Sequence, residues 1–144
     1  MSMSMSKAER EAFLAETRVA VISMAEEGRG PLTIPVWYSY EPGGEIRFIT
    51  GDTSKKALLL RRAGRMSLCV QTETPPYKYL SVEGPVTFGK PDFERDSKPM
   101  ALRYLGEQMA EMYLASTADE RLTSVLVSLK PERWLSVDYT KMEF

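Results

Sequence analysis

The residues best suited to binding chemistry are two adjacent lysines, Lys55 and Lys56, within the segment Ile46–Arg65. The pattern there predicts a strand running directly into a helix, with the lysines in the helix's first turn. Free N–H groups give a helix N-terminus partial positive charge, so two lysines there cost stability unless an anion offsets them. Thr50, Ser54 and the two lysines could together supply hydroxyls, backbone donors and charge to one phosphate.

Three arginines follow in the same basic segment. No acidic residue occurs between Thr53 and Thr72, whereas Arg61, Arg62 and Arg65 are cationic. These arginines fall near the C-terminal end of the predicted helix, where positive charge complements the helix dipole. We therefore interpret them first as structural residues rather than ligand contacts.

The segment Leu32–Glu41 is the second candidate. Its alternation predicts a strand with Leu32, Ile34, Val36, Tyr38 and Tyr40 on one face. Because Pro35 cannot donate to a sheet, this strand is interrupted or lies at an edge. Exposed backbone groups beside flat side chains suit a planar ring, which predicts ring contacts from Ile34, Pro35, Val36, Trp37 and Tyr38. The alternative is that Trp37 and Tyr38 are core or dimer-interface aromatics.

A third group of residues surrounds Pro75-Pro76. Tyr77 and Lys78 follow these prolines at a rigid corner and could close over a ligand. Gln71 ends the preceding strand and could contact a ring, or it could be an ordinary polar strand end. We treat the next residues, up to Val86, as an amphipathic strand.

Composition excludes several classes of protein. The chain has 144 residues, enough for one domain, and a net charge of −1, which argues against nucleic acid as the main partner. It has one cysteine and no histidine, so an intrachain disulfide, a Ser/His/Asp triad and histidine-ligated zinc or haem are excluded, and we predict no metal site. No segment is long and apolar enough to span a membrane, and we expect a cytoplasmic protein.

The hydrophobic pattern predicts a mainly β domain over residues 1–144, with a frayed end at residues 1–5. Strands are expected over residues 18–26, 32–41, 45–50, 66–72, 77–89, 124–129 and 133–139, the last two being separate or one strand bent at Pro131. Helices are expected over residues 7–16, 53–62, 97–114 and 119–123. Consecutive hairpins predict an antiparallel sheet curled into a barrel, with flanking helices.

Five motifs occur along the chain in a fixed order. They are Ile-Pro-Val-Trp-Tyr at 34–38, Ile-Thr at 49–50, Thr-Ser-Lys-Lys-Ala at 53–57, Tyr-Leu-Ser-Val-Glu-Gly at 79–84, and Lys-Pro-Glu-Arg-Trp at 130–134 with Asp138. In this order the sequence resembles the pyridoxamine 5′-phosphate oxidase-like split β-barrels, which are FMN-binding split barrels. It is most similar to flavin/deazaflavin oxidoreductases of the B type.

The resemblance implies a homodimer with two cofactors in clefts between the subunits. The residues matching Thr50, Ser54, Lys55 and Lys56 would hold the cofactor phosphate, and those matching 34–38 would lie along the ring. It also implies coenzyme F420 or FMN as cofactor. Arg61 and Lys78 could attract the acidic tail of F420, which favours F420.

The leading hypothesis is an F420-dependent oxidoreductase that passes hydride to a conjugated small molecule such as an enone or quinone. Tyr38 and Tyr77 are candidate proton donors, although no catalytic residue is identified. The alternatives are an FMN-binding oxidase or reductase of the same fold, a non-catalytic carrier of F420, and a basic-helix nucleic-acid binder.

Overall fold

The computed structural model describes residues 2–142, so Met1, Glu143 and Phe144 lie outside the described residues. Its helices are α1 (Lys7–Ala15), α2 (Lys55–Ala63), α3 (Lys98–Ser116) and α4 (Ala118–Arg121), with a π-helical turn η1 (Phe93–Ser97) and a 3₁₀ turn η2 (Tyr139–Lys141). Its strands are β1 (Ala20–Met24), β2 (Leu32–Val36), β3 (Ile46–Gly51), β4 (Arg65–Gln71), β5 (Lys78–Gly89), β6 (Ser124–Leu129) and β7 (Arg133–Asp138).

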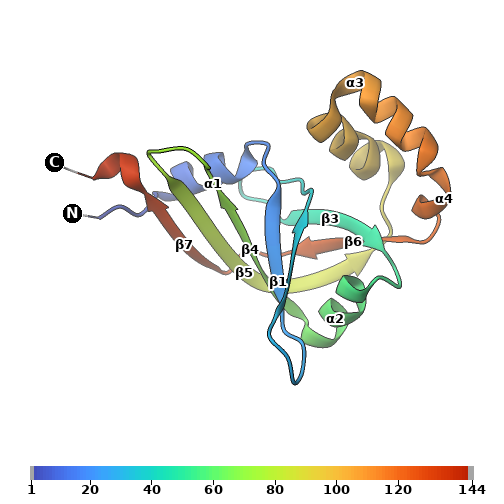
Figure 1. Ribbon diagram of the computed structural model, residues 1–144, viewed down its shortest axis with the longest axis horizontal. Helices are drawn as coiled ribbons and strands as arrows, with labels where there is room; N and C mark the ends of the chain where they lie inside the picture. Colours follow the sequence, from blue (N-terminus) through green and yellow to red (C-terminus); the bar gives the residue numbers. More distant parts are fainter. Residues whose placement is uncertain (1, 143–144) are drawn as a thin grey trace.

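The strands form one curled antiparallel sheet in the order β2-β1-β4-β5-β6-β3, with β7 beside β5 (Figure 1). The two end strands of this order, β2 and β3, approach each other only at a bridge between Ser39 and Arg47 within the described residues. The barrel is therefore closed at one point and open along the rest of this seam. This is the split β-barrel with flanking helices that the sequence predicts.

The long strand β5 belongs to both halves of the barrel, and Gly84 is where it changes partner. β5 pairs with β7 up to Glu83 and with β4 up to Pro85, and it pairs with β6 from Val86 onward. A Cβ atom at Gly84 would lie 1.8 Å from the carbonyl oxygen of Lys130, so only glycine allows this approach. The chain between β6 and β7 turns here, and the two are separate strands rather than one bent strand.

Local signals set the helix boundaries as expected. Ser6 and Glu9 form a reciprocal capping box at the start of α1. Ser54 caps α2 by accepting from the N–H of Ala57, and Gly64 ends that helix with a positive φ of 71°. Met3 and Met5, in the segment predicted to fray, lie against β7: the Met3 carbonyl accepts from Asp138 N–H and Met5 N–H donates to Ser136.

The third helix differs from the single helix predicted over 97–114. Gly106 has φ 78° and ψ 172°, which breaks α3 into two arms. Figure 1 shows α3 and α4 beside the barrel rather than covering the whole sheet. We name the second arm together with α4, residues 107–121, the outer arm.

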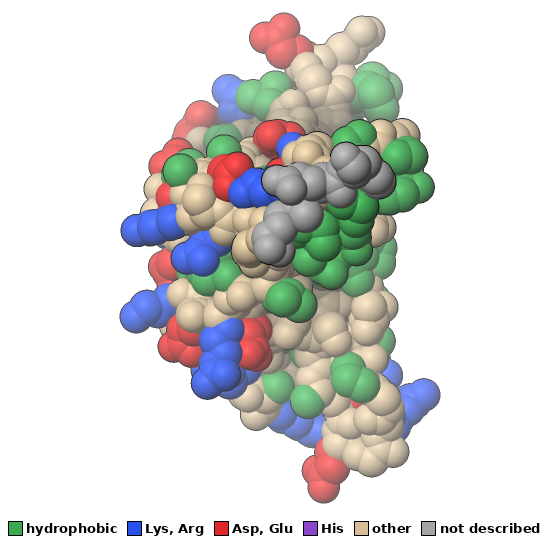
Figure 2. Space-filling view, turned by 90° about the vertical axis from the view of Figure 1, so that its left-hand side faces the viewer, with side chains coloured by type: hydrophobic (Ala, Val, Ile, Leu, Met, Phe, Trp, Pro, Cys, Tyr) green, Lys and Arg blue, Asp and Glu red, His purple; other side chains and the backbone are tan. Residues whose placement is uncertain are grey.

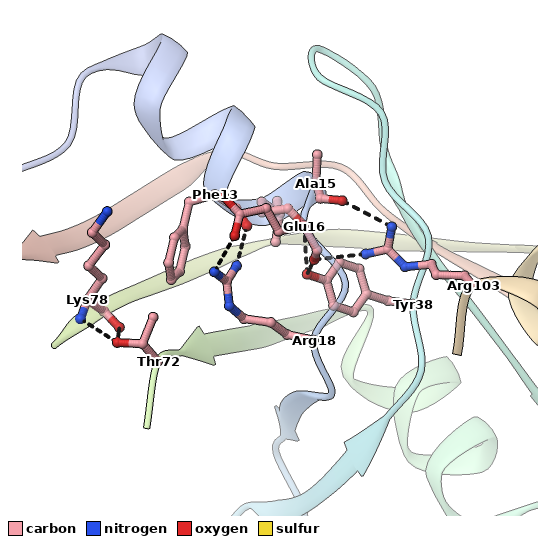
Figure 3. A network of polar contacts seen from close by, with 9 residues as sticks. Phe13, Ala15, Glu16, Arg18, Tyr38, Thr72, Lys78 and Arg103 are labelled. Carbon is pink, nitrogen blue, oxygen red and sulfur yellow. Dashed lines mark hydrogen bonds and ion pairs between the residues drawn. The ribbon is translucent and has the colours of Figure 1, made fainter. Parts of the chain in front are cut away.

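Donors from the segment after α1 and from two more distant parts of the chain meet at the carboxyl end of α1 (Figure 3). The last carbonyls of a helix have no partner within it, and here side chains supply the donors. Arg18 donates to the Phe13 carbonyl (2.6 Å), and Tyr38 to that of Leu14 (2.6 Å). Arg103, from the first arm of α3, donates to the carbonyls of residues 15 and 16, both at 3.0 Å.

We predict that Gly84→Ala destabilises the fold by about 1–3 kcal/mol or more, because the new Cβ would overlap backbone that cannot move aside. Urea denaturation measures this free energy. Gly89→Ala is the matched control, since a Cβ there meets no atom within 4 Å. Equal stability of the two variants would contradict the close approach at Gly84.

Tyr38→Phe tests the hydrogen bond to α1. Burial raises the pKa of Tyr38 to about 12, whereas an unfolded tyrosine titrates near 10, at about its ordinary value. The stabilisation from the neutral phenol is thus complete below pH ~10 and is lost as the pH rises from ~10 to ~12. We expect Tyr38→Phe to cost about 1 kcal/mol at pH 8.

The difference between wild type and Tyr38→Phe should then shrink on alkaline titration of the unfolding free energy. A difference that stays constant up to pH 12 would show that the buried phenol does not carry this effect.

Candidate functional site

A cavity of about 770 Å³ lies at the open seam between β2 and β3. One wall comes from the end of β2 and another from the end of β3, where the two strands are not hydrogen-bonded to each other. Both arms of α3, together with α4, supply the rest. The lining residues from β2 and β3 and the segments that follow them are Pro35, Val36, Trp37, Ile49, Thr50, Gly51 and Lys56.

Five residues predicted from the sequence meet in this cavity. Pro35, Val36 and Trp37 line one side, and Thr50 and Lys56 line another. The two segments that sequence patterns proposed separately, one for a planar ring and one for an anion, therefore border the same space. The exposed flank of β2 and the start of α2 can contact a single ligand.

The other predicted anion contacts lie outside this lining. The Ser54 hydroxyl lies 3.1 Å from the Thr50 hydroxyl, and it also caps α2 by accepting from the Ala57 N–H. Lys55 forms an ion pair with Glu26 at 3.3 Å, so a carboxylate of the protein offsets its charge at the helix start. Arg61 pairs with Asp52 and lies over the ring of Phe88, in the structural role considered for the arginines.

The predicted ring contacts divide between the two faces of β2 and its continuation. Ile34 points inward and packs against the hydrophobic core. Tyr38 is fully buried, and its hydroxyl donates to α1, so it does not face the cavity. Pro35 and Trp37 point the other way and line the cavity. Val36, on the same face as Ile34, packs against the core and also borders the cavity.

Gln71, Tyr77 and Lys78 do not line the cavity of this chain. Gln71 is exposed at the end of β4, and extending the β1–β4 register by two residues puts it opposite Val19, a lining residue. Tyr77 is 48% exposed at the corner before β5. Lys78 begins β5 in register with Asp138 of β7.

The outer arm and the first arm of α3 supply residues that sequence reasoning missed. These are Met100, Ala101, Tyr113, Leu114, Thr117, Glu120 and Arg121, with Val19, Ser97 of η1, Thr123 and Ser124 alongside. The sequence predicted here only a helix over residues 97–114. The break at Gly106, a residue favoured where φ is positive, was the available signal that this helix folds back.

An aromatic cluster fixes the wall of the cavity. Trp37 stacks on Tyr104 with ring centroids 5.0 Å apart and planes within 4°, and Tyr113 lies at 5.4 Å on a tilted plane. The Tyr104 hydroxyl donates to the Arg18 carbonyl (2.7 Å) and accepts from Tyr38 N–H (3.1 Å). It thus bridges β1 and β2 just beyond their last ladder pair, at the point where the strands separate.

The cavity consequently has two chemically different parts. Val19, Pro35, Trp37 and Tyr113 make one part apolar and flat. Thr50 and Ser124, at the junction of β3 and β6, and the charged residues Lys56, Glu120 and Arg121 make another part of the lining polar, with more positive than negative charge. Such a site fits an elongated ligand with an anionic end and a planar apolar end.

Residues 2–142 hold no cluster of three His, Cys, Asp or Glu side chains arranged to bind a metal ion. No helix in that range has the length and apolar character needed to cross a membrane.

Comparison with solved structures finds many of this fold. The conserved hypothetical protein Rv2991 from Mycobacterium tuberculosis superposes with a TM-score of 0.78 at 23% identity, over 96% of this chain and 89% of that one. A structure described as an F420 reductase gives 0.62 at 15% identity, over 87% and 94%. A FAD-binding protein from Mesorhizobium loti gives 0.63 at 18% identity, over 92% of each chain.

The TM-scores establish that these proteins share the fold of this chain. None of the curated protein sequences matches this chain significantly. The sequence does match the family described as pyridoxamine 5′-phosphate oxidase, and the match extends over residues 6–138, nearly the whole chain. Together with the split barrel and the seam between β2 and β3, this shows that the chain belongs to the pyridoxamine 5′-phosphate oxidase family.

Proposed function

We propose that this protein is an F420-dependent oxidoreductase that reduces a conjugated small molecule, such as an enone or quinone. The observation that carries the proposal is that Lys56 and the segment Pro35–Trp37 border the same cavity. An anion-binding group and a flat apolar wall in one space suit a phosphorylated ring cofactor better than either feature alone.

The residues at the cationic part would hold the phosphate. Lys56 and the Thr50 hydroxyl border the cavity. Among the described residues, the backbone N–H groups at positions 55 and 56 have no hydrogen-bond acceptor, as expected for the first turn of a helix. Ser54 would position the Thr50 hydroxyl and the start of α2, because its own hydroxyl oxygen contacts the Thr50 hydroxyl and accepts from the Ala57 N–H.

The apolar part would hold the ring. Trp37 is immobilised by its stack on Tyr104, so the wall is preorganised rather than formed on binding. When bound, the reduced deazaflavin supplies the hydride, and the protein's contribution is to orient the ring and keep water from it. Of the tyrosines considered as proton donors, Tyr38 has its hydroxyl engaged with α1, which leaves Tyr77 or solvent.

A homodimer is part of this proposal. Val21, Cys69, Ser81 and Leu135 follow one another across the outer face of β1, β4, β5 and β7. This row is small or apolar, and Leu135 is 62% exposed. The same face continues to Val19 and Pro35 at the cavity, so a second copy docked on it would help close the site.

The end of the molecule near the termini is also partly apolar. Figure 2 shows hydrophobic side chains gathered towards one side of this end, with charged side chains mainly on the other. Exposed hydrophobic residues in this part of the chain include Tyr77 before β5, Leu135 within β7 and Tyr139 after β7. In such a dimer, we propose that three residues of one subunit contact the cofactor held in the cavity of the other. These are Gln71, Tyr77 and Lys78.

An FMN-binding oxidoreductase is the second candidate, favoured by the same cavity and by the fold shared with a FAD-binding protein. A carrier that holds F420 without turnover would use the same residues. Titration with each cofactor distinguishes the F420-dependent enzyme from the FMN-binding one. A turnover assay distinguishes both enzymes from the F420 carrier.

The deciding experiment titrates purified protein with F420 and, separately, with FMN, following ligand fluorescence. We expect micromolar binding of F420, weaker binding of FMN, and consumption of reduced F420 in the presence of a quinone or enone. Tight FMN binding without F420 binding would favour the second candidate, and binding without turnover across an acceptor panel would favour the carrier.

Substituting each lysine in turn tests the anion site. Lys56→Ala should weaken cofactor binding at least about tenfold, or ~1.4 kcal/mol, because Lys56 borders the cavity. Lys55→Ala is the matched control: it removes the same charge one residue away, but Lys55 is paired with Glu26 and should change affinity less than about threefold. Equal losses would mean that general charge, not the cavity, governs binding.

A further inference from the structure

The junction of β3 and β6 brings a second cation to the cavity. Gly51 pairs with Ser124, and Asp52 N–H donates to the Thr123 carbonyl at 2.8 Å. This register sets α4, which ends at Arg121, beside the segment that leads from β3 into α2. Arg121 and Lys56, which lie on two helices far apart in the sequence, therefore both line the cavity beside this junction.

Neither cation is neutralised by the protein. Within residues 2–142, no carboxylate oxygen lies within 4.0 Å of the Lys56 or Arg121 nitrogen atoms, whereas Lys55 and Arg61 nearby are both paired. Glu120 also lines the cavity, but its side chain is exposed and forms no ion pair with Arg121. The local charge therefore favours an anion.

Arg121 is also held in place. Its Nη1 donates to the Thr117 hydroxyl at 3.0 Å, and its guanidinium lies 5.1 Å from the centre of the Phe93 ring. A guanidinium has five N–H donors, so one bond to Thr117 leaves others available to a ligand. A preorganised guanidinium is suited to bidentate contact with phosphate oxygens, which an ammonium cannot make.

We propose that Arg121 is a second anion-binding residue of this cavity, acting with Lys56 as a two-sided clamp on a phosphoryl group. The proposal rests on the proposed function and extends it, because it assigns selection of phosphorylated over phosphate-free cofactor to the outer arm. The shared chemistry is a phosphoryl oxygen pair, which FMN offers as a monoester and F420 as a diester.

The test compares wild type with Arg121→Gln and Arg121→Lys, using FMN against riboflavin and F420 against its phosphate-free deazaflavin chromophore. Arg121→Gln should lose at least about tenfold in affinity for whichever phosphorylated ligand binds, and less than about twofold for its phosphate-free counterpart. Arg121→Lys should lie between. Arg62→Gln is the control for net charge, since Arg62 is exposed and outside the cavity lining.

An equal loss of affinity for the phosphorylated and the phosphate-free ligand of a pair would overturn the proposal. It would mean that Arg121 only stabilises the structure of the outer arm. Unchanged affinity for all ligands would overturn it as well. A thermal melt of each apo variant, expected within about 2 °C of wild type, reports separately on folding.

An independent measurement distinguishes failure of this proposal from failure of the proposed function. Titration of wild type with inorganic phosphate, followed by NMR of the arginine Nε–H groups, should shift the Arg121 resonance, and Lys56→Ala should weaken that shift. If neither F420 nor FMN binds but phosphate shifts Arg121, the oxidoreductase function is wrong and the clamp stands. If phosphate leaves Arg121 unshifted, the clamp is wrong whatever the cofactor.

Discussion

The position of the segments around the candidate site depends on hydrogen bonds to the carbonyl groups at the end of α1. These groups need donors, and three side chains from different parts of the chain supply them: Arg18, Tyr38 and Arg103. Two are arginines, whose charge complements the negative end of the helix dipole. By satisfying one helix end, the fold fixes the start of β1, the segment after β2 and the first arm of α3 relative to each other.

The open seam follows from this arrangement. Beyond Val36 the chain leaves β1, and Tyr104, one residue after Arg103, bridges the separated strands through its hydroxyl while its ring supports Trp37. Pro35 contributes because it has no N–H to offer a neighbouring strand. A cavity between β2 and β3 therefore exists because side chains of α3 replace the backbone pairing that would otherwise close the barrel.

The site also shows how neighbouring residues of one type acquire different roles. Lys55 and Lys56 are adjacent, but successive positions on a helix point about 100° apart, so one reaches Glu26 and the other the cavity. Trp37 and Tyr38 divide in the same way, because successive residues in extended chain face opposite sides. The residue types in these segments indicated that they could bind a ligand. The direction of each side chain determines which residue of a pair faces the cavity.

The sequence by itself determined the features whose causes act over a few residues: the capping box at Ser6, the Ser54 cap, the glycine end of α2 and the alternation through β2. It also nominated the two segments that meet in the cavity. Only the tertiary structure decided that α3 breaks and folds back, that Glu26 pairs with Lys55, and that Arg121 and Lys56 line one cavity. These outcomes depend on strand register and helix docking between distant segments, where many pairings satisfy the same local pattern and packing of the whole chain selects one.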